Sequence, residues 1–481
     1  IKIGGVEHSI TQLGVGKPVI GPMVGAPYAA IVAGAFTLPI PTQNGPVDYT
    51  ATNLPPGLSL SDTTGIISGI PTKAGSYDVT VKGKNAFASA DATLTFKVNV
   101  ADLATGTVGT FHGLVDRHPV LNGDLASRIQ ITTTPGGGYT GKLITGTTAT
   151  SLKGQLTAAV GAPTLARLVL PLPDLGATLD LTLDDATDTL SGTLSDGGTN
   201  TAAVQGWRNS WADVADNAAD FAAIHSFYLE QPEVADDLPR GYGFGSFVVK
   251  AKTGDVTIGG TLADGTPFTT TTFIGQSGQV LIYVPLYASR GSLVGKLTIT
   301  AGNSAPSNNT IAGTPDWMKP DPLAKSKELA YRAGFNPIPL TALGGTYTPP
   351  DPGARVLALP AANLNAQLSF SLGGLAASFD QALTIANPKA SSLTNTATIA
   401  TPVNGTKVAK FSATSGGFEG EFTIPGASTS LDRKALFSGQ IVTTALGTKG
   451  YGFFLLPKVP GSSEAVKTSP KLSGVIVLDK P

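Results

Sequence analysis

The sequence predicts an all-β protein built of several antiparallel units. The 59 glycines and 35 prolines among 481 residues supply turns for many short strands. Apolar and polar residues alternate with a period of two, as at residues 179–183 (LDLTL), whereas apolar runs with a helical period are scarce. Short strands punctuated by turn residues are typical of β-sandwiches and barrels.

Composition narrows the possible partners. The hydrophobic fraction of 41% is too high for a disordered chain, and the charged fraction of 14% is typical of a secreted β protein. A net charge of −1 gives no electrostatic reason to bind nucleic acid or an anionic membrane. The absence of cysteine excludes disulfides and thiolate metal sites. We therefore expect no nucleic-acid partner and a core that depends on buried area alone.

Membrane and targeting signals are also missing from the sequence. No run of 18 apolar residues occurs, so we expect no transmembrane segment. The chain starts at Ile1 without the pattern of a signal peptide, which indicates a mature or excised piece.

The clearest structural pattern lies in residues 241–300. Alternating strands are separated there by turns at Thr253-Gly254-Asp255 and Ala263-Asp264-Gly265, which predicts an antiparallel meander. Weaker copies of the phrase strand, Gly-rich turn, aromatic residue, Gly, strand occur at residues 129–143 and 408–422. We expect duplicated β units, with positive φ at Gly254, Gly265 and Gly417.

Residues 24–100 contain an ordered series of turns and strands. LPPGLSL at 54–60 is followed by TGIISGIP at 64–71 and by Gly75-Ser76-Tyr77. This series resembles the bacterial putative-Ig (cadherin-like) repeat found in tandem on large surface proteins. The resemblance implies a β-sandwich. The residues agree with it, because Gly57 follows two prolines in a turn and Tyr77, Val79 and Val81 alternate toward one face.

The remainder of the chain, residues 111–481, is similar to the calycin-like, barrel-type repeats of very large verrucomicrobial and planctomycete surface proteins. The phrases that carry this similarity are GYGFGSFVV, GTLADGT, VPLY with GSLVGKL, AGF, YTPP and GYGFFL. The resemblance implies antiparallel β-barrel-like or sandwich units and a cell-surface setting.

These patterns divide the chain into seven parts. We expect a linker or contact arm at 1–23, an Ig-like β-sandwich at 24–100, a first β unit at 105–208, an acidic connector at 209–240, a central meander unit at 241–322, a connector at 323–345 and a C-terminal β unit at 346–481. The first connector is expected to hold a short helix from about Trp211 to Phe221, with an extended segment after it. One or two helical turns are expected between Leu323 and Arg332.

No constellation of catalytic or metal-binding residues stands out. His112 and His118 have Gly113 and Asp116 between them, which indicates a bend rather than a metal pair on one strand. The adjacent carboxylates, such as Asp184-Asp185, lie in apparent turns without the aromatic cleft that a glycosidase needs. No serine has the GxSxG context. We predict a protein that is not an enzyme and has no catalytic residue, cofactor or metal.

Two sets of residues are candidates for binding. Aromatic rings can stack on the apolar faces of sugars, and the tryptophans that could do so are Trp207, Trp211 and Trp317. The alternative is that these rings close the core. Large aliphatic side chains in the N-terminal arm could contact a neighbouring subunit by adding a strand to a sheet edge: Ile1, Ile3, Val6, Ile10 and Leu13. The alternative there is a flexible linker.

The sequence as a whole predicts a non-catalytic, extracellular structural protein. We expect a subunit or segment of a bacterial surface fibre, sheath or surface layer, which associates with itself or with other surface proteins through its β modules. The alternative function is an adhesin or carbohydrate-binding surface protein that contacts polysaccharide through exposed aromatic residues.

Overall fold

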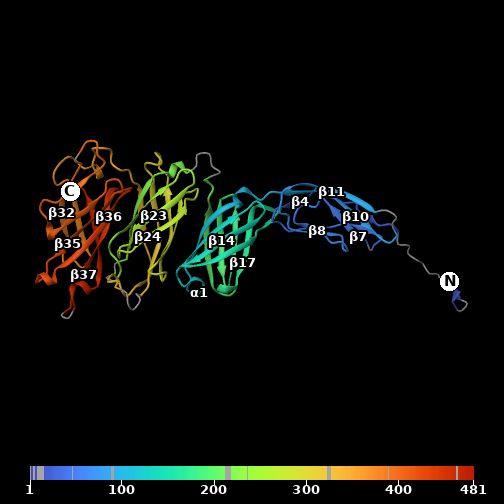
Figure 1. Cartoon of the computed structure of the whole chain (residues 1–481), viewed down its shortest axis with the longest axis horizontal. Helices are drawn as coiled ribbons and strands as arrows, with labels where there is room; N and C mark the ends of the chain where they lie inside the picture. Colours follow the sequence, from blue (N-terminus) through green and yellow to red (C-terminus); the bar gives the residue numbers. More distant parts are fainter. Residues whose placement is uncertain are drawn as a thin grey trace. The chain divides into compact units, whose positions relative to one another are not determined.

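The computed structural model confirms the all-β prediction. It describes residues 2–3, 6–7, 16–45, 47–87, 91–211, 218–233, 235, 237–321, 327–387, 389–461 and 464–481. The chain forms several β-sheets in which most strand pairs are antiparallel, and Figure 1 colours them from blue to red along the sequence. The chain divides into two compact units, one made of Ile1–Thr110, Ile131–Gly141 and Ser151–Leu194, the other of Phe111–Gln130, Lys142–Thr150 and Ser195–Pro481.

Small sheets make up the N-terminal part of the chain. A sheet with the order β4-β11-β10-β7 accompanies a second sheet with the order β5-β9-β8 and the pair β3-β6. The pair β1-β2 precedes them. Their bounds are β1 Lys2–Ile3, β2 Val6–Glu7, β3 Val19–Ile20, β4 Tyr28–Ile31, β5 Phe36–Pro39, β6 Thr42–Gln43, β7 Asp48–Thr52, β8 Leu58–Leu60, β9 Ile66–Gly69, β10 Gly75–Lys84 and β11 Ala92–Ala101.

The core of this N-terminal part follows from the period-two pattern of its strands. Val79 and Val81 of β10 are fully buried while the residues beside them are more exposed, as predicted. Phe96 of β11 and Ile67 of β9 are buried as well, so both sheets contribute apolar side chains to the interior. This alternation is typical of a sandwich with one wet and one dry face per sheet.

The next sheet runs from Gly109 to Arg208. Its strand order is β15-β14-β13-β12-β20-β19-β18-β17-β16, and β12 pairs antiparallel with β20, so the first strand of the segment lies beside the last. The bounds are β12 Gly109–Val115, β13 Ser127–Thr133, β14 Gly138–Thr145, β15 Thr148–Gln155, β16 Thr157–Ala159, β17 Ala162–Leu172, β18 Ala177–Asp184, β19 Thr189–Ser195 and β20 Thr201–Arg208.

The third large sheet extends from Ile224 to Thr346. Its order is β24-β23-β22-β21-β30-β27-β26-β28-β29, with β25 paired to β26. The bounds are β21 Ile224–Glu230, β22 Gly243–Val249, β23 Asp255–Thr261, β24 Pro267–Phe273, β25 Gln279–Leu286, β26 Gly291–Thr300, β27 Thr310–Gly313, β28 Asp316–Lys319, β29 Phe335–Pro339 and β30 Thr341–Thr346.

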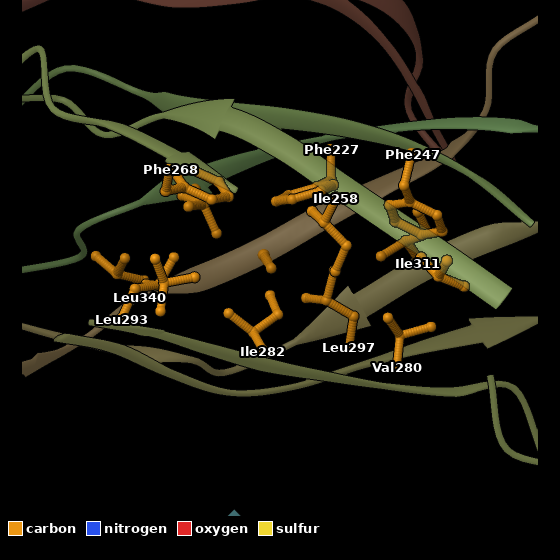
Figure 2. Close-up of a cluster of buried hydrophobic side chains, with 14 of the residues drawn as sticks. Phe227, Phe247, Ile258, Phe268, Val280, Ile282, Leu293, Leu297, Ile311 and Leu340 are labelled. Carbon is orange, nitrogen blue, oxygen red and sulfur yellow. The ribbon is translucent and has the colours of Figure 1, made fainter. Parts of the chain in front are cut away.

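The sheet curls around a continuous apolar core, shown in Figure 2. Phe227, Ile258 and Phe268 point from one layer toward Ile282 and Leu297 in the other. Each of these side chains is at most 5% exposed. Full burial of a large apolar side chain stabilises the fold by about 1.5–3 kcal/mol, so this cluster dominates the stability of the sheet.

The C-terminal sheet has the order β33-β32-β31-β38-β37-β36-β35-β34. Its core is rich in phenylalanine, and Phe370 contacts the rings of Phe379, Phe422, Phe437 and Phe454. The bounds are β31 Ala366–Leu372, β32 Phe379–Ala386, β33 Thr396–Thr398, β34 Lys407–Phe411, β35 Gly417–Ile424, β36 Arg433–Thr444, β37 Gly447–Pro457 and β38 Lys471–Asp479.

Helices are short. The described residues contain one α-helix, α1 (Pro119–Asn122), which His118 caps by accepting hydrogen bonds from the backbone N–H groups of Val120 and Leu121. The remaining helical elements there are 3-10 turns: η1 Thr105–Thr107, η2 Pro173–Leu175, η4 Ala219–Phe221, η5 Val356–Ala358, η6 Val403–Gly405, η7 Thr429–Leu431 and η8 Val466–Thr468. No helix in the described part of the chain is long and apolar enough to cross a bilayer.

Both predicted connectors contain strands. The extended segment expected at the end of the first connector is confirmed, because Ile224–Glu230 form β21. Residues 335–345, expected in the second connector, form β29 and most of β30 of the third sheet. The predicted helix at 211–221 has residues 212–217 outside the described residues, and its end forms only η4. Residues 327–332 contain no helix, because Ala330 bridges to Lys471 instead. Pairing with distant strands outweighs local helix propensity here.

The turns of the meander form where the sequence predicts them, with one difference. Gly254 and Gly265 have φ of 64° and 89°. In the last repeat the residue with positive φ is Gly416, at 75°, whereas Gly417 is the first residue of β35. The prediction for Gly417 was therefore wrong by one position. Two adjacent glycines offered no signal to tell them apart.

Candidate functional site

The three tryptophans predicted to stack on sugars lie inside the protein. Trp207, Trp211 and Trp317 are 8%, 5% and 1% exposed. Each indole N–H donates a hydrogen bond within the fold. Trp207 donates to the carbonyl of Phe273 and Trp211 to the carbonyl of Ile274. Trp317 donates to the Tyr287 hydroxyl. The prediction that these rings are exposed for sugar stacking is therefore wrong. They close the core, as the alternative interpretation held.

The residues of the predicted contact arm are only partly described. Ile1, Ile10 and Leu13 lie outside the described residues, while Ile3 and Val6 are paired with each other between β1 and β2. The arm is also shorter than predicted, since Val19 and Ile20 form β3 and pair with β6 of the Ig-like part.

An aromatic cluster joins the third and C-terminal sheets, which belong to the same compact unit. Tyr228 of β21 stacks on Tyr451 of β37 with ring centroids 4.3 Å apart. Tyr242 meets both rings edge to face, at 5.2 Å and 5.4 Å. Phe244 of β22 stacks on Phe453 at 6.1 Å. These five rings, here called the aromatic seam, hold the two sheets in contact.

Backbone hydrogen bonds accompany the aromatic seam. The N–H of Tyr242 donates to the carbonyl of Gly452 at 3.1 Å, and the N–H of Gly241 donates to the Ser473 hydroxyl at 3.2 Å. A Cβ atom at Gly241 would lie 2.3 Å from Cβ of Phe453, so the absence of a side chain permits this close approach. Burial raises the pKa of the Tyr228 hydroxyl to about 12, which keeps that ring neutral at physiological pH.

A repeated sequence motif forms the aromatic seam. Gly-Tyr-Gly-Phe occurs at 241–244 and again at 450–453. The tyrosines of the two copies contact each other, and so do the phenylalanines. Both copies of the motif are visible in the sequence and suggest a repeat, but the sequence does not predict that one copy packs on the other.

A polar hollow of about 300 Å³ borders β12, β13, β23 and β24. Arg128 is 8% exposed, and its Nε atom is buried without a hydrogen-bond acceptor in the described part of the chain. Its Nη2 atom donates to Nδ1 of His112 at 3.3 Å. The imidazole also lies 4.3 Å from the ring of Phe273 and faces the Gln130 amide. We call this feature the Arg128 hollow.

The electrostatics of the Arg128 hollow favour a negative charge. Burial, followed by the nearby Arg128 charge, lowers the pKa of His112 to about 3, so the ring remains a neutral acceptor for Arg128. Asp255 also lines the hollow, but its carboxylate lies 3.7 Å from the ammonium of Lys250. Burial lowers the pKa of Arg128, and no ion pair to a carboxylate is found for its guanidinium in the described residues. A buried cation without a paired anion is costly.

The described residues show no group of three or more histidine, aspartate or glutamate side chains that could hold a metal ion. His112 lies at the Arg128 hollow, whereas His118 caps α1, so the two histidines act in separate places. The sequence signal that could have found the Arg128 hollow is the cationic residue beside the alternating Ile129 and Ile131 of β13.

Comparisons with solved structures give only weak likenesses. A putative alpha-galactosidase/melibiase and a putative alpha-galactosidase, both from Bacteroides fragilis NCTC 9343, are 36% and 31% identical over 18% and 19% of this chain, with TM-scores of 0.16. The chain spans about a fifth of the length of either, 18% and 19%. A Quinonprotein alcohol dehydrogenase-like protein from Bacteroides thetaiotaomicron VPI-5482 is 7% identical over 69% of this chain and 98% of its own, with a TM-score of 0.16. Scores this low support no inference about fold or activity.

The comparison with curated proteins gives no match. A family model described as Putative Ig domain matches residues 17–101. The matched segment contains β3 to β11, the strands of the N-terminal sheets. The match supports the resemblance of this segment to the Ig-like repeat and extends it to Lys17, within the predicted arm. Residues 17–101 are therefore an Ig-like domain, a module typical of extracellular proteins.

Proposed function

We propose that the protein is a non-catalytic, extracellular structural protein, a subunit or segment of a bacterial surface fibre, sheath or surface layer. The observation that carries this proposal is the aromatic seam. Copies of one motif from two β units pack against each other through their rings, and one backbone hydrogen bond joins the two copies. An extended load-bearing chain needs stiff junctions of this kind.

The strength of the junction can be estimated. A well-placed aromatic pair contributes about 0.5–1.5 kcal/mol beyond the area that it buries. Four ring pairs within the aromatic seam meet this geometry. Since ordinary interfaces between domains of one chain are small and polar and permit relative motion, an aromatic contact accompanied by backbone hydrogen bonds favours a rigid element.

Subunit association is assigned to the N-terminal arm. β4 and β7 are the outer strands of the sheet β4-β11-β10-β7, so each has a free edge within that sheet. A segment that adds a strand to such an edge pairs its backbone groups there. We propose that residues 1–15 make this contact with another copy of the chain.

Deletion of residues 1–15 tests this assignment and spares β3. The truncated chain should keep its β circular dichroism and lose assembly, measured as the critical concentration for sedimentation. A matched control is the exchange of Lys2 for glutamine, which changes the charge of the arm but keeps its length. Assembly of the truncated chain at the critical concentration of the full chain would eliminate the arm as the contact.

The Arg128 hollow supports a second candidate function, a surface protein that binds acidic polysaccharide. The observation that favours it is the buried guanidinium with an unpaired Nε, beside Gln130 and Phe273. A carboxylate seated in the hollow would compensate this charge. The carboxylate of a sugar acid would then be the group that the hollow accepts.

Calorimetry with polygalacturonate as the probe tests the second candidate. Saturable binding that Arg128→Met abolishes would support it, with Arg290→Met as the matched control because that arginine lies outside the hollow. Binding that is absent, or equal in both variants, would eliminate the second candidate function.

A further inference from the structure

A lysine and an aspartate lie against each other in the interior of the third sheet. Lys319 is the last residue of β28, and Asp264 lies in the turn between β23 and β24. The side chains are 1% and 0% exposed. Nζ of Lys319 lies 2.6 Å from Oδ2 of Asp264. Neither residue belongs to the aromatic seam or the Arg128 hollow.

Aromatic groups surround this pair. The Tyr287 hydroxyl donates to Oδ2 of Asp264 at 2.8 Å, and the Trp317 indole donates to the Tyr287 oxygen at 3.0 Å. The lysine ammonium lies 4.8 Å from the centre of the Tyr287 ring. The backbone N–H of Thr266 donates to the other carboxylate oxygen at 2.9 Å. Both oxygens of Asp264 therefore accept hydrogen bonds that hold the carboxyl group still.

A second carboxylate touches the same lysine. Glu328 accepts a hydrogen bond from Nζ of Lys319 and is 29% exposed, so it reaches from the buried pair toward solvent. It is placed to take a proton from the ammonium and to return it. Three side chains thus form a nucleophile, an electrophile and a proton acceptor in one site.

Amide formation removes both charges of the pair from the interior. Taking two charges out of water costs several kcal/mol per ion, and one proton transfer within the pair gives the neutral amine and acid. The neutral forms are the reactants of amide formation. Groups held within contact distance react as if their concentration were on the order of 10⁵–10⁸ M.

We propose that Lys319 and Asp264 condense to form an intramolecular isopeptide bond. The neutral Nζ attacks Cγ of Asp264 while Glu328 removes a proton from the nitrogen. The tetrahedral intermediate, hydrogen-bonded by Tyr287 and the Thr266 N–H, then expels one oxygen. Glu328 returns the proton to that oxygen, and it leaves as water. The sum is one ammonium and one carboxylate giving one amide and one water, with no oxidant, reductant or cofactor.

The bond would connect parts of the sheet that are distant in the strand order. β23 is next to the edge strand β24, whereas β28 lies at the other end of the order beside β29. A covalent link there closes the sheet across its interior and resists unfolding of the segment between residues 264 and 319. This inference does not depend on assembly or on the proposed structural role.

Intact mass spectrometry of the denatured full-length protein tests the proposal without any mutation. The expected mass is lower than that of the sequence by one water molecule, and a protease digest should yield one branched peptide that joins Lys319 to Asp264. A full mass and two separate peptides would overturn the proposal and leave a buried ion pair.

Variants assign the roles. Asp264→Asn should lose ammonia instead of water, because the amide nitrogen becomes the leaving group. Glu328→Gln should retain the full mass, or lose water at least 10-fold more slowly after refolding, and its circular dichroism shows whether it has folded. Lys410→Gln is a control, because that surface lysine pairs with Glu419 elsewhere and its variant should still lose one water. Loss of water at the wild-type rate in Glu328→Gln would show that Glu328 takes no part in the reaction.

Discussion

Tyr242 and Tyr451 hold the same position in two copies of the motif Gly-Tyr-Gly-Phe, and their rings meet edge to face with centroids 5.4 Å apart and planes at 89°. The phenylalanines that follow each of them by two residues are also in contact. The contact therefore joins like surfaces, to which each copy of the motif supplies the same chemical groups.

The first prediction concerns this contact. Tyr451→Ala should destabilise the third and C-terminal sheets by about 2 kcal/mol, because it removes ring contacts to both Tyr228 and Tyr242. Urea denaturation followed by circular dichroism measures the change. Phe87→Ala is the control, since that ring is 63% exposed and its loss should cost less than about 0.5 kcal/mol.

A double-mutant cycle makes the first prediction sharper. Tyr228→Ala and Tyr451→Ala should couple by about 0.5–1.5 kcal/mol if the stacked rings contribute directly to stability. Additive effects would show that the sheets are held together by other contacts.

The second prediction separates two neighbouring glycines. Gly416→Ala should cost at least about 1–2 kcal/mol, because its φ is 75° and the new Cβ would lie 2.7 Å from Nε2 of Gln440. Gly417→Ala should cost less, since its Cβ would meet the nearest atom at 3.6 Å. Melting temperatures of the two variants check this order. The reverse order would show that the turn is shifted by one residue.

The third prediction is acid destabilisation by His225. This ring is fully buried, stacks on Phe247 at 5.1 Å and donates from Nδ1 to the carbonyl of Ala223. Burial lowers the pKa of His225 to about 4, although the hydrogen bond to the Ala223 carbonyl by itself raises this pKa. The unfolded chain therefore binds a proton below about pH 6.5 that the folded chain does not bind.

Stability should fall as the pH decreases from about 6.5 to about 4, and the full effect for His225 is about 3 kcal/mol. His225→Phe keeps a ring against Phe247 and removes the titration, so its stability should depend less steeply on pH over this range. His112, whose pKa is also lowered, contributes to the pH dependence of stability in both proteins. Equal slopes for variant and wild type in urea titrations would contradict the assignment.

The sequence was most informative where local patterns decide the structure. The alternation of Val79 and Val81 and the turns at Gly254 and Gly265 were all predictable from period and turn chemistry. Residues 224–230 show the limit. An extended segment was predictable there, but its acidic, Ala-rich surroundings suggested a connector. Only pairing with β22 and β30 makes it a strand inside the sheet. Such pairing is set by distant residues.

The candidate sites were harder to predict for the same reason. Trp317 looked like a sugar-stacking ring, but the fold buries it and points its N–H at Tyr287. Lys319 and Asp264 are 55 residues apart in the sequence, and only the folded sheet brings them together. Side-chain chemistry is visible in a sequence, whereas the proximity that makes it a site comes from topology.

The central claim, that this protein is a structural element of an extracellular assembly, is tested most directly by electron microscopy of the purified full-length chain over a concentration series, with sedimentation velocity on the same samples. The account predicts ordered fibres or sheets above a critical concentration, with a repeat that is lost when residues 1–15 are removed. A monodisperse monomer at every concentration, with no ordered contacts on the grid, would contradict it.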